Sequence, residues 1–118
     1  MVAVIDDDES VRESLPDLLK QLGLEPRAFA SAQEFLSSTA VAGVRCLLVD
    51  VAMPRMTGPE LQQELIRRGS PVPIVFITAQ ADESLRGRLL MQGAVACLFK
   101  PFTEHELQAA LNAALRQT

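Results

Sequence analysis

The chain lacks tryptophan and tyrosine, and phenylalanine alone supplies its aromatic content of 4%. It has no run of lysine and arginine, and its formal net charge is −4 at pH 7. Nucleic-acid-binding proteins generally present clustered basic residues, and those that hold single strands add aromatic rings for base stacking. These shortages argue against direct nucleic-acid binding by this chain.

Long apolar segments are also missing. A membrane-spanning helix needs about 20 consecutive apolar residues, and no stretch approaches that length. Met1 leads directly into a short apolar segment without the features of a signal peptide, so we expect a cytoplasmic protein with no membrane contact. The two cysteines, Cys46 and Cys97, fall in expected strands without metal-type spacing. We expect both to be buried, reduced thiols.

The chain does contain a regular alternation of two patterns over its 118 residues, a length that suits one domain. Short and mostly apolar segments alternate with amphipathic segments of helical period, which predicts an α/β fold with a parallel sheet and right-handed crossovers. The segment at 25–29 is more polar and contains Pro26, so we expect it at a sheet edge. The expected strands are 2–5, 25–29, 46–50, 74–77 and 95–99, and the expected helices are 9–22, 31–38, 58–68, 83–92 and 104–116.

Helix boundaries carry recognisable signals. Gly23 should close the first helix, whereas Pro16 inside the same helix predicts either a kink or a later start. Two other helices begin with the spacing of a capping box, and one begins with proline at a first position. These starts are Ser31 with Glu34, Thr103 with Glu106, and Gly58-Pro59.

A polar or charged side chain follows four of the five expected strands. Asp6 and Asp7 follow the first, Asp50 ends the third, Thr78 follows the fourth and Lys100 follows the fifth. The carboxyl ends of parallel strands lie along one edge of the sheet, and ligands of open α/β sheets bind there. One such residue is unremarkable in a loop, but four strand ends in this order predict a single site.

The residue types at this site suit phosphoryl chemistry. Asp6, Asp7 and Asp50 would repel one another, and a hard cation such as Mg²⁺ relieves that repulsion with few protein oxygens. Lys100 adds a positive charge and Thr78 adds a hydroxyl donor. A carboxylate could therefore attack phosphorus while the metal and the lysine offset charge on the phosphoryl oxygens.

These residues resemble the receiver domain of two-component response regulators over essentially the whole chain. Val11-Arg12-Glu13-Ser14-Leu15 and the Met-Pro-x-Met-Thr-Gly stretch are most similar to FixJ-like regulators of the LuxR family, which usually carry a C-terminal helix-turn-helix domain. The matching segments are Val4-Ile5-Asp6-Asp7-Asp8, Asp50-Val51-Ala52-Met53-Pro54-Arg55-Met56-Thr57-Gly58, Ile77-Thr78-Ala79 and Lys100-Pro101-Phe102.

The resemblance implies a flavodoxin-like (βα)5 sandwich with strand order 2-1-3-4-5. It implies that Asp50 accepts a phosphoryl group from a sensor histidine kinase, and that Thr78 and Lys100 contact the phosphoryl oxygens. It further implies that Thr78 moves on activation and that Lys100-Pro101 is a cis peptide. Exposed apolar residues on the face made by the fourth helix, fifth strand and fifth helix would gain from burial, so we expect phosphorylation to produce a homodimer or a partner contact there. Such a domain is a switch rather than an enzyme.

The resemblance also implies a magnesium site. Asp7, Asp50 and the backbone carbonyl of Ala52 would bind Mg²⁺ directly, and Asp6 would act through water.

Two features depart from the receiver pattern. Receivers usually have tyrosine or phenylalanine three residues before the lysine, and that ring changes rotamer during switching, but this chain has Cys97 there. The helix expected at 83–92 contains Gly87 and has Leu89-Leu90-Met91 near its end, so we expect one of these three apolar side chains to be exposed. Such a side chain marks either a slightly hydrophobic surface or a face that docks a partner. The single histidine, His105, should be solvated.

Several alternatives stay open from the sequence. A haloacid-dehalogenase-like phosphatase needs an acid two residues after the nucleophile, where this chain has Ala52. A flavin carrier needs a hydroxyl- and glycine-rich loop where Asp6-Asp7-Asp8-Glu9 stands. The receiver could also belong to a hybrid histidine kinase, or serve as a stand-alone scaffold. Both ends of the chain adjoin expected elements, so we expect a domain from a longer protein, with transcriptional regulation as its output.

Overall fold

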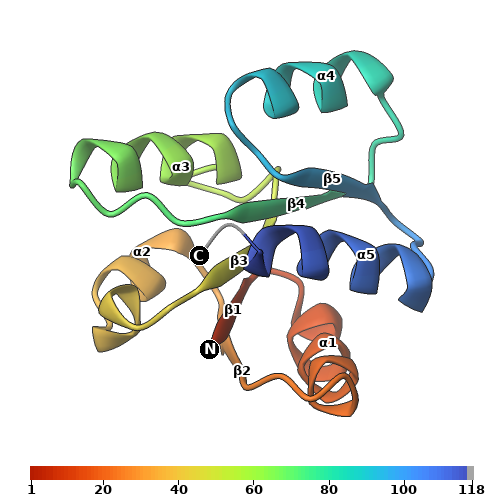
Figure 1. Ribbon diagram of the computed structural model, residues 1–118. Coiled ribbons are helices and arrows are strands. Elements are labelled where there is room, and N and C mark those ends of the chain that lie inside the picture. Colours follow the sequence, from red (N-terminus) through yellow and green to blue (C-terminus); the bar gives the residue numbers. More distant parts are fainter. Residues whose placement is uncertain (117–118) are drawn as a thin grey trace.

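The computed structural model describes residues 1–116 and shows a parallel sheet between two layers of helices (Figure 1). Helices α1 and α5 cover one face, and α2, α3 and α4 cover the other. The strands are β1 Val2–Ile5, β2 Pro26–Phe29, β3 Cys46–Asp50, β4 Ile74–Thr78 and β5 Ala96–Phe99. The helices are α1 Glu9–Gln21, α2 Ala32–Leu36, α3 Gly58–Arg67, α4 Glu83–Met91 and α5 Glu104–Leu115, with a short 3-10 helix η1 at Thr39–Ala42.

The sheet has the order β2-β1-β3-β4-β5 with every pair parallel, which confirms the flavodoxin-like prediction. Strand β2, the polar one with Pro26, lies at an edge as expected. Strands β1, β3 and β4 read as continuous apolar runs because helices bury both of their faces.

The helix starts confirm most of the capping signals. Thr103 and Glu106 form a complete capping box, and Thr57 forms another with Glu60 that the sequence analysis did not identify. At Ser31 the hydroxyl accepts from the Glu34 amide, but the Glu34 carboxylate accepts from the amide of Ala30. That second half of the box is therefore displaced by one residue.

The structure decides one open alternative and corrects one local prediction. Helix α1 begins at Glu9 and runs through Pro16, so the later start is excluded. Helix α2 ends at Leu36 instead of reaching residue 38, and η1 follows it. The hydroxyl of Ser38 donates to the carbonyl of Phe35 and accepts from the amide of Ala40. Serine hydroxyls compete in this way with the helical ladder, and here they end one helix and start another.

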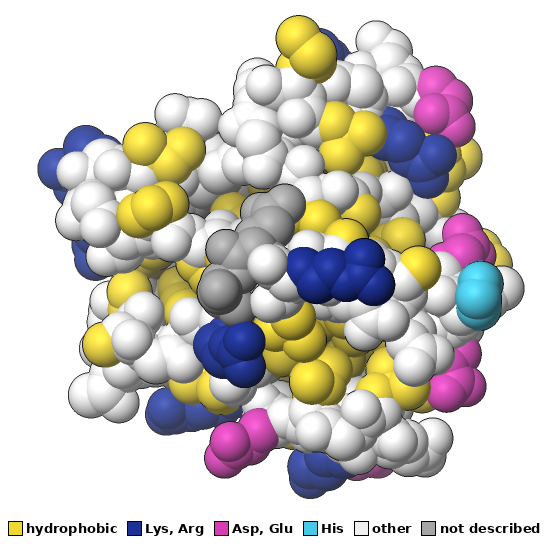
Figure 2. Space-filling model, in the orientation of Figure 1, with side chains coloured by type: hydrophobic (Ala, Val, Ile, Leu, Met, Phe, Trp, Pro, Cys, Tyr) yellow, Lys and Arg dark blue, Asp and Glu magenta, His cyan; other side chains and the backbone are white. Residues whose placement is uncertain are grey.

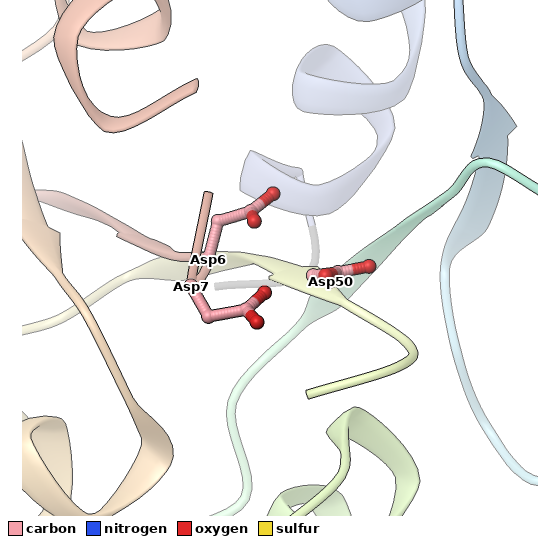
Figure 3. A group of neighbouring side chains, drawn as sticks. All are labelled: Asp6, Asp7 and Asp50. Carbon is pink, nitrogen blue, oxygen red and sulfur yellow. The ribbon is translucent and has the colours of Figure 1, made fainter. Parts of the chain in front are cut away.

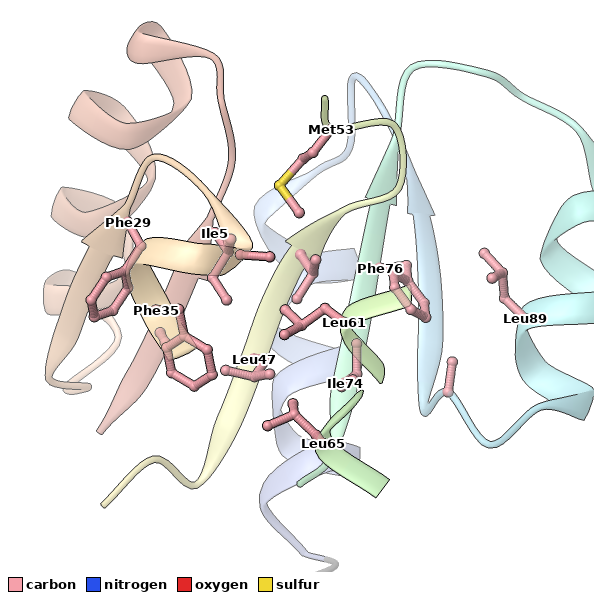
Figure 4. Close-up of a cluster of buried hydrophobic side chains, with 14 of the residues drawn as sticks. Ile5, Phe29, Phe35, Leu47, Met53, Leu61, Leu65, Ile74, Phe76 and Leu89 are labelled. Carbon is pink, nitrogen blue, oxygen red and sulfur yellow. The ribbon is translucent and has the colours of Figure 1, made fainter. Parts of the chain in front are cut away.

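Each face of the sheet has its own core. On the α2–α3–α4 side, Phe29 and Phe35 meet edge to face, and Met53 lies over the carboxyl end of the sheet (Figure 4). Cys97 belongs to this core and Cys46 to the core beneath α1 and α5. Both thiols are free and buried, as predicted.

Helix α4 is held less firmly than the other long helices. Leu89 is its single buried residue, whereas Leu90 is 42% exposed and Met91 is 89% exposed. The expectation of an exposed apolar residue on this helix is therefore confirmed. Among the residues that the structure describes, no helix has the length and apolar character needed to span a membrane.

Candidate functional site: an acidic pocket at the carboxyl edge of the sheet

The predicted site residues lie at one edge of the sheet because all strands run in the same direction. Asp6 and Asp7 follow β1, and Asp50 is the last residue of the adjacent strand β3. Figure 3 shows the three side chains at these neighbouring strand ends. Thr78 ends β4, on the other side of β3, and Lys100 follows β5.

The three carboxylates form a compact cluster. Each offers an oxygen that lies within 4.8 Å of the corresponding oxygens of the other two. Asp6 is buried, Asp50 is half-buried and Asp7 is exposed, so the cluster opens to solvent on one side. The structure thus brings together the acids that the sequence analysis assigned to one site.

Asp6 is held by contacts from Lys100, Asp8 and Arg12. Lys100 Nζ lies 3.3 Å from Asp6 Oδ2, and the Asp8 amide donates to Asp6 Oδ1 at 2.9 Å. Arg12 Nη1 donates to the Asp6 backbone carbonyl at 2.8 Å. The sequence analysis missed this role of Arg12. The signal was its position four residues after the α1 N-cap Asp8, one turn into the helix that starts at the pocket.

Asp50 is a poorly solvated carboxylate with a raised pKa. Burial, and then the nearby Asp6 charge, raise the pKa of Asp50 from 3.8 to about 6, while Lys100 and the Ala52 amide pull that pKa down. The Ala52 amide lies 3.4 Å from Asp50 Oδ1. The carboxylate is therefore largely charged at pH 7 and poorly solvated, and a bound cation would stabilise that charge further.

Thr78 and Lys100 are linked through the backbone of β4 and β5. The Lys100 amide donates to the Thr78 carbonyl at 2.8 Å, and Thr78 is the register partner of Phe99. The buried Thr78 hydroxyl accepts from the Gln80 amide at 3.0 Å. The Lys100-Pro101 peptide is cis, as expected.

Gly58 is a supporting residue that the sequence analysis placed only as a helix start. A Cβ atom at position 58 would lie 2.7 Å from the Asp50 carbonyl oxygen and 2.8 Å from Phe76 Cε1. The first residue of α3 can therefore pack directly beneath Asp50 because it has no side chain. The Gly58 amide also donates to the Val51 carbonyl and ties α3 to the loop after β3.

The donor set fits a magnesium ion. Mg²⁺ prefers hard oxygen ligands and keeps several waters, so a partly open group of carboxylates suits it better than a closed cage. Asp7 is the exposed member and Asp50 the half-buried one, and both can offer oxygens toward solvent.

Comparison with known proteins agrees with this geometry. Residues 2–112 match the model of the response regulator receiver domain family. The chain is 37% identical over 116 residues to the response regulator protein TodT of Pseudomonas putida, covering 98% of this chain and 51% of TodT. It is also 37% identical over 116 residues to the transcriptional regulatory protein FixJ of Bradyrhizobium diazoefficiens, covering 98% of this chain and 57% of FixJ.

A solved structure of the response regulator StyR superposes with a TM-score of 0.89 at 41% identity, covering 98% of this chain and 59% of StyR. The chain spans about half the length of the curated relatives it matches. Sequence, topology and family model agree, and the chain belongs to the response regulator receiver domain family.

Proposed function

We propose that this receiver domain is a phosphorylation switch in which Asp50 accepts a phosphoryl group from a sensor histidine kinase. The observation that carries the proposal is the half-buried Asp50 carboxylate in a cluster with two other acids and near a lysine. Such a constellation is poorly suited to a structural role, because the acids repel one another in the absence of a cation.

The transfer step follows from the positions of the side chains. An Asp50 carboxylate oxygen forms a bond to phosphorus while the bond from phosphorus to the kinase histidine nitrogen breaks, and the electron pair stays on that nitrogen. Lys100 would turn from Asp6 toward the phosphoryl oxygens, and the Thr78 hydroxyl would donate to another of them. Both residues offset the charge that the phosphoryl group brings into the pocket.

The proposed metal site uses Asp7, Asp50 and the backbone carbonyl of Ala52 as direct ligands, with Asp6 acting through water. Mg²⁺ would supply positive charge that orients the phosphoryl donor and neutralises its oxygens. The pocket's own residues then position the nucleophile, hold the lysine and provide the hydroxyl donor.

A kinase has an apolar surface to approach beside this pocket. A groove of about 220 Å³ starts at Lys100 and is bounded by residues of α1 and by Phe102. Figure 2 shows hydrophobic atoms in the seam between α1 and α5. We propose that the partner's histidine-bearing helix packs along this groove, which would bring its phosphohistidine to Asp50. The groove residues are Val11, Ser14, Leu15, Leu18, Lys100 and Phe102.

The output lies outside this chain in the proposed scheme. Because the relatives TodT and FixJ are about twice as long, we propose that this domain belongs to a longer transcriptional regulator with a DNA-binding helix-turn-helix domain. Phosphorylation would promote a homodimer on the face made by α4, β5 and α5, where Leu90 offers exposed apolar surface. A histidine kinase uses ATP, so this activity would take place in the cytoplasm.

The proposal is tested by chemical trapping of the acyl phosphate. We expect acetyl phosphate and Mg²⁺ to phosphorylate the domain, and borohydride reduction followed by mass spectrometry to place the label on Asp50. Asp50→Asn should lose the label, whereas Asp17→Asn, which removes an exposed carboxylate from α1, should keep it. A label on another residue, or equal labelling of Asp50→Asn, contradicts the assignment.

The same experiment separates the alternatives. A scaffold receiver would fold normally but take up no label. A phosphatase would turn over acetyl phosphate continuously, but Ala52 stands where such an enzyme needs its acid and base, so we expect the label to accumulate instead. A receiver in a hybrid kinase would label identically, and the full gene would distinguish it.

A further inference from the structure

Arg86 connects helix α4 to strand β5 through its guanidinium group. Its Cζ atom lies 3.8 Å from the centroid of the Phe99 ring, and its Nε donates to the Cys97 carbonyl at 3.1 Å. Its Nη1 lies 3.2 Å from Glu83 Oε1 one turn earlier in α4. A flat cation stacked on a ring and bonded to a backbone carbonyl is held in a single orientation.

These contacts matter because only Leu89 and the partly buried Leu85 of α4 pack against the core. Leu89 is the single buried residue of α4, and Gly87 beside Arg86 lowers the intrinsic stability of the helix. Segments with few buried apolar contacts open most easily. The Arg86 contacts to Phe99 and Cys97 thus add to the two apolar side chains that hold α4 against the sheet.

The position of these contacts places them next to the phosphorylation pocket. Phe99 is the register partner of Thr78, whose hydroxyl faces the pocket in the proposed function. The loop from Thr78 to the α4 N-cap Asp82 is short, and the Gln80 amide is bonded to the Thr78 hydroxyl. A Thr78 hydroxyl that turned to a phosphoryl oxygen would give up that bond and release the loop that leads into α4.

We propose that Arg86 is the latch of this receiver: it closes α4 over Cys97 and Phe99 in the resting state, and phosphorylation of Asp50 releases it. The proposal rests on the proposed phosphoacceptor function. It assigns to a cation stacked on Phe99 the coupling that a ring at position 97 would otherwise provide. The small Cys97 side chain leaves the arginine access to the strand backbone.

The chain carries its own reporter for this latch. Cys97 is 4% exposed and lies beneath α4, whereas Cys46 is 0% exposed in the opposite core beneath α1 and α5. Opening of α4 should expose the Cys97 thiol and leave the Cys46 thiol covered. Alkylation with iodoacetamide, followed by mass spectrometry of each cysteine, therefore measures α4 opening with an internal control.

Arg86→Gln should speed Cys97 alkylation about tenfold. This corresponds to a decrease of about 1.4 kcal/mol in the free energy needed to open α4. Arg88→Gln removes the same charge from an exposed position two residues later and should leave the rate unchanged. Burial raises the pKa of the Cys97 thiol, and the Arg86 charge offsets part of that rise. Loss of the charge alone would therefore slow alkylation, so a faster reaction reports opening of α4. Arg86→Lys keeps the charge but not the flat stack and should also react faster, as should Phe99→Leu.

The trigger is tested with Mg²⁺ and fluoroberyllate, a phosphoryl mimic, whose binding is read separately as an Asp50-dependent rise in melting temperature. Fluoroberyllate should speed Cys97 alkylation of the wild type about tenfold, toward the rate of Arg86→Gln. It should change the alkylation rate of Arg86→Gln little. A melting shift with an unchanged Cys97 rate overturns the latch alone. Equal Cys97 rates in wild type, Arg86→Gln and Phe99→Leu also overturn it. Absence of any melting shift overturns the phosphoacceptor function and its trigger together.

Discussion

Lys100 is paired with Asp6: its Nζ lies 3.3 Å from Asp6 Oδ2, and the two residues come from opposite ends of the chain. The Asp6 side chain is 1% exposed and the Lys100 side chain 26% exposed. This ion pair offsets part of the repulsion in the acidic pocket in the absence of a metal. In the proposed function Lys100 pairs with Asp6 at rest and with the phosphoryl group after transfer. Lys100 must therefore change partners during the reaction.

Lys100→Gln should therefore destabilise the metal-free domain. The change leaves the buried Asp6 charge without its cation, and because the pair is partly exposed we expect a loss of about 1–2 kcal/mol. Millimolar Mg²⁺ should restore part of that loss by supplying another cation. Urea unfolding with Mg²⁺ and with chelator measures the difference, and Lys20→Gln, on the exposed end of α1, is the control. Equal destabilisation in both conditions contradicts this role.

Asp50→Asn should stabilise the metal-free domain at neutral pH. The pKa of Asp50 is about 6 in the folded state against an ordinary 3.8, so between these values the folded state binds more protons and wild-type stability falls as pH rises. This difference in pKa corresponds to about 3 kcal/mol of folding free energy. Because the group is half-buried, solvent screening reduces the expected effect on stability to about 1–2 kcal/mol.

The advantage of Asp50→Asn over wild type should be small near pH 4, grow up to about pH 6 and then stay constant. Urea unfolding of both proteins across this range, in chelator, gives the difference directly. An advantage that is constant across the whole range would show that the carboxylate charge is not its cause.

Asp7→Asn should separate metal binding from folding. Because a ligand that binds only the folded state stabilises it, Mg²⁺ at ten times its dissociation constant should stabilise the wild type by about 1.4 kcal/mol. Asp7 is the exposed acid of the cluster, so its neutral variant should fold normally and lose the Mg²⁺ effect. Thermal melting in Mg²⁺ and in chelator tests this, with Asp17→Asn as control. Identical wild-type melting in both conditions rules out the metal site.

Much of the fold was predictable because the signals are local and repeated. Apolar strand runs, the Thr103 capping box and Gly23 at positive φ each specify their own segment without help from the rest of the molecule. The acidic pocket followed from one further rule, that parallel strands present their carboxyl ends along a common edge.

Other features depend on contacts that local patterns do not contain. The reach of Arg12 to the Asp6 carbonyl and of Arg86 to Phe99 depends on how a helix sits on the sheet. The η1 helix arises from a competition among Ser38 hydrogen bonds that composition does not decide. The close approach at Gly58 requires the positions of Asp50 and Phe76 together.

Gly58→Ala should damage both stability and the pocket. The added methyl group would meet the Asp50 carbonyl and the Phe76 ring at distances below 3.0 Å, so β3 or α3 must shift. Overpacking of this kind costs about 1–3 kcal/mol. Chemical unfolding measures the loss, and reduced fluoroberyllate binding would show the displacement of Asp50. A variant as stable as wild type would mean that α3 moves freely at its first turn.

Gly87→Ala should have the opposite effect on stability. A Cβ atom at position 87 meets no atom within 4 Å, so alanine fits and should stabilise α4 by about 0.5–1 kcal/mol. A stiffer α4 should also open less, which would slow Cys97 alkylation at rest and reduce its response to fluoroberyllate. Gly43→Ala, another substitution at an open position, is the control for effects on the unfolded chain. Fluoroberyllate could instead speed Cys97 alkylation equally in Gly87→Ala, Gly43→Ala and the wild type. In that case α4 stiffness does not limit switching, and glycine at position 87 needs another explanation.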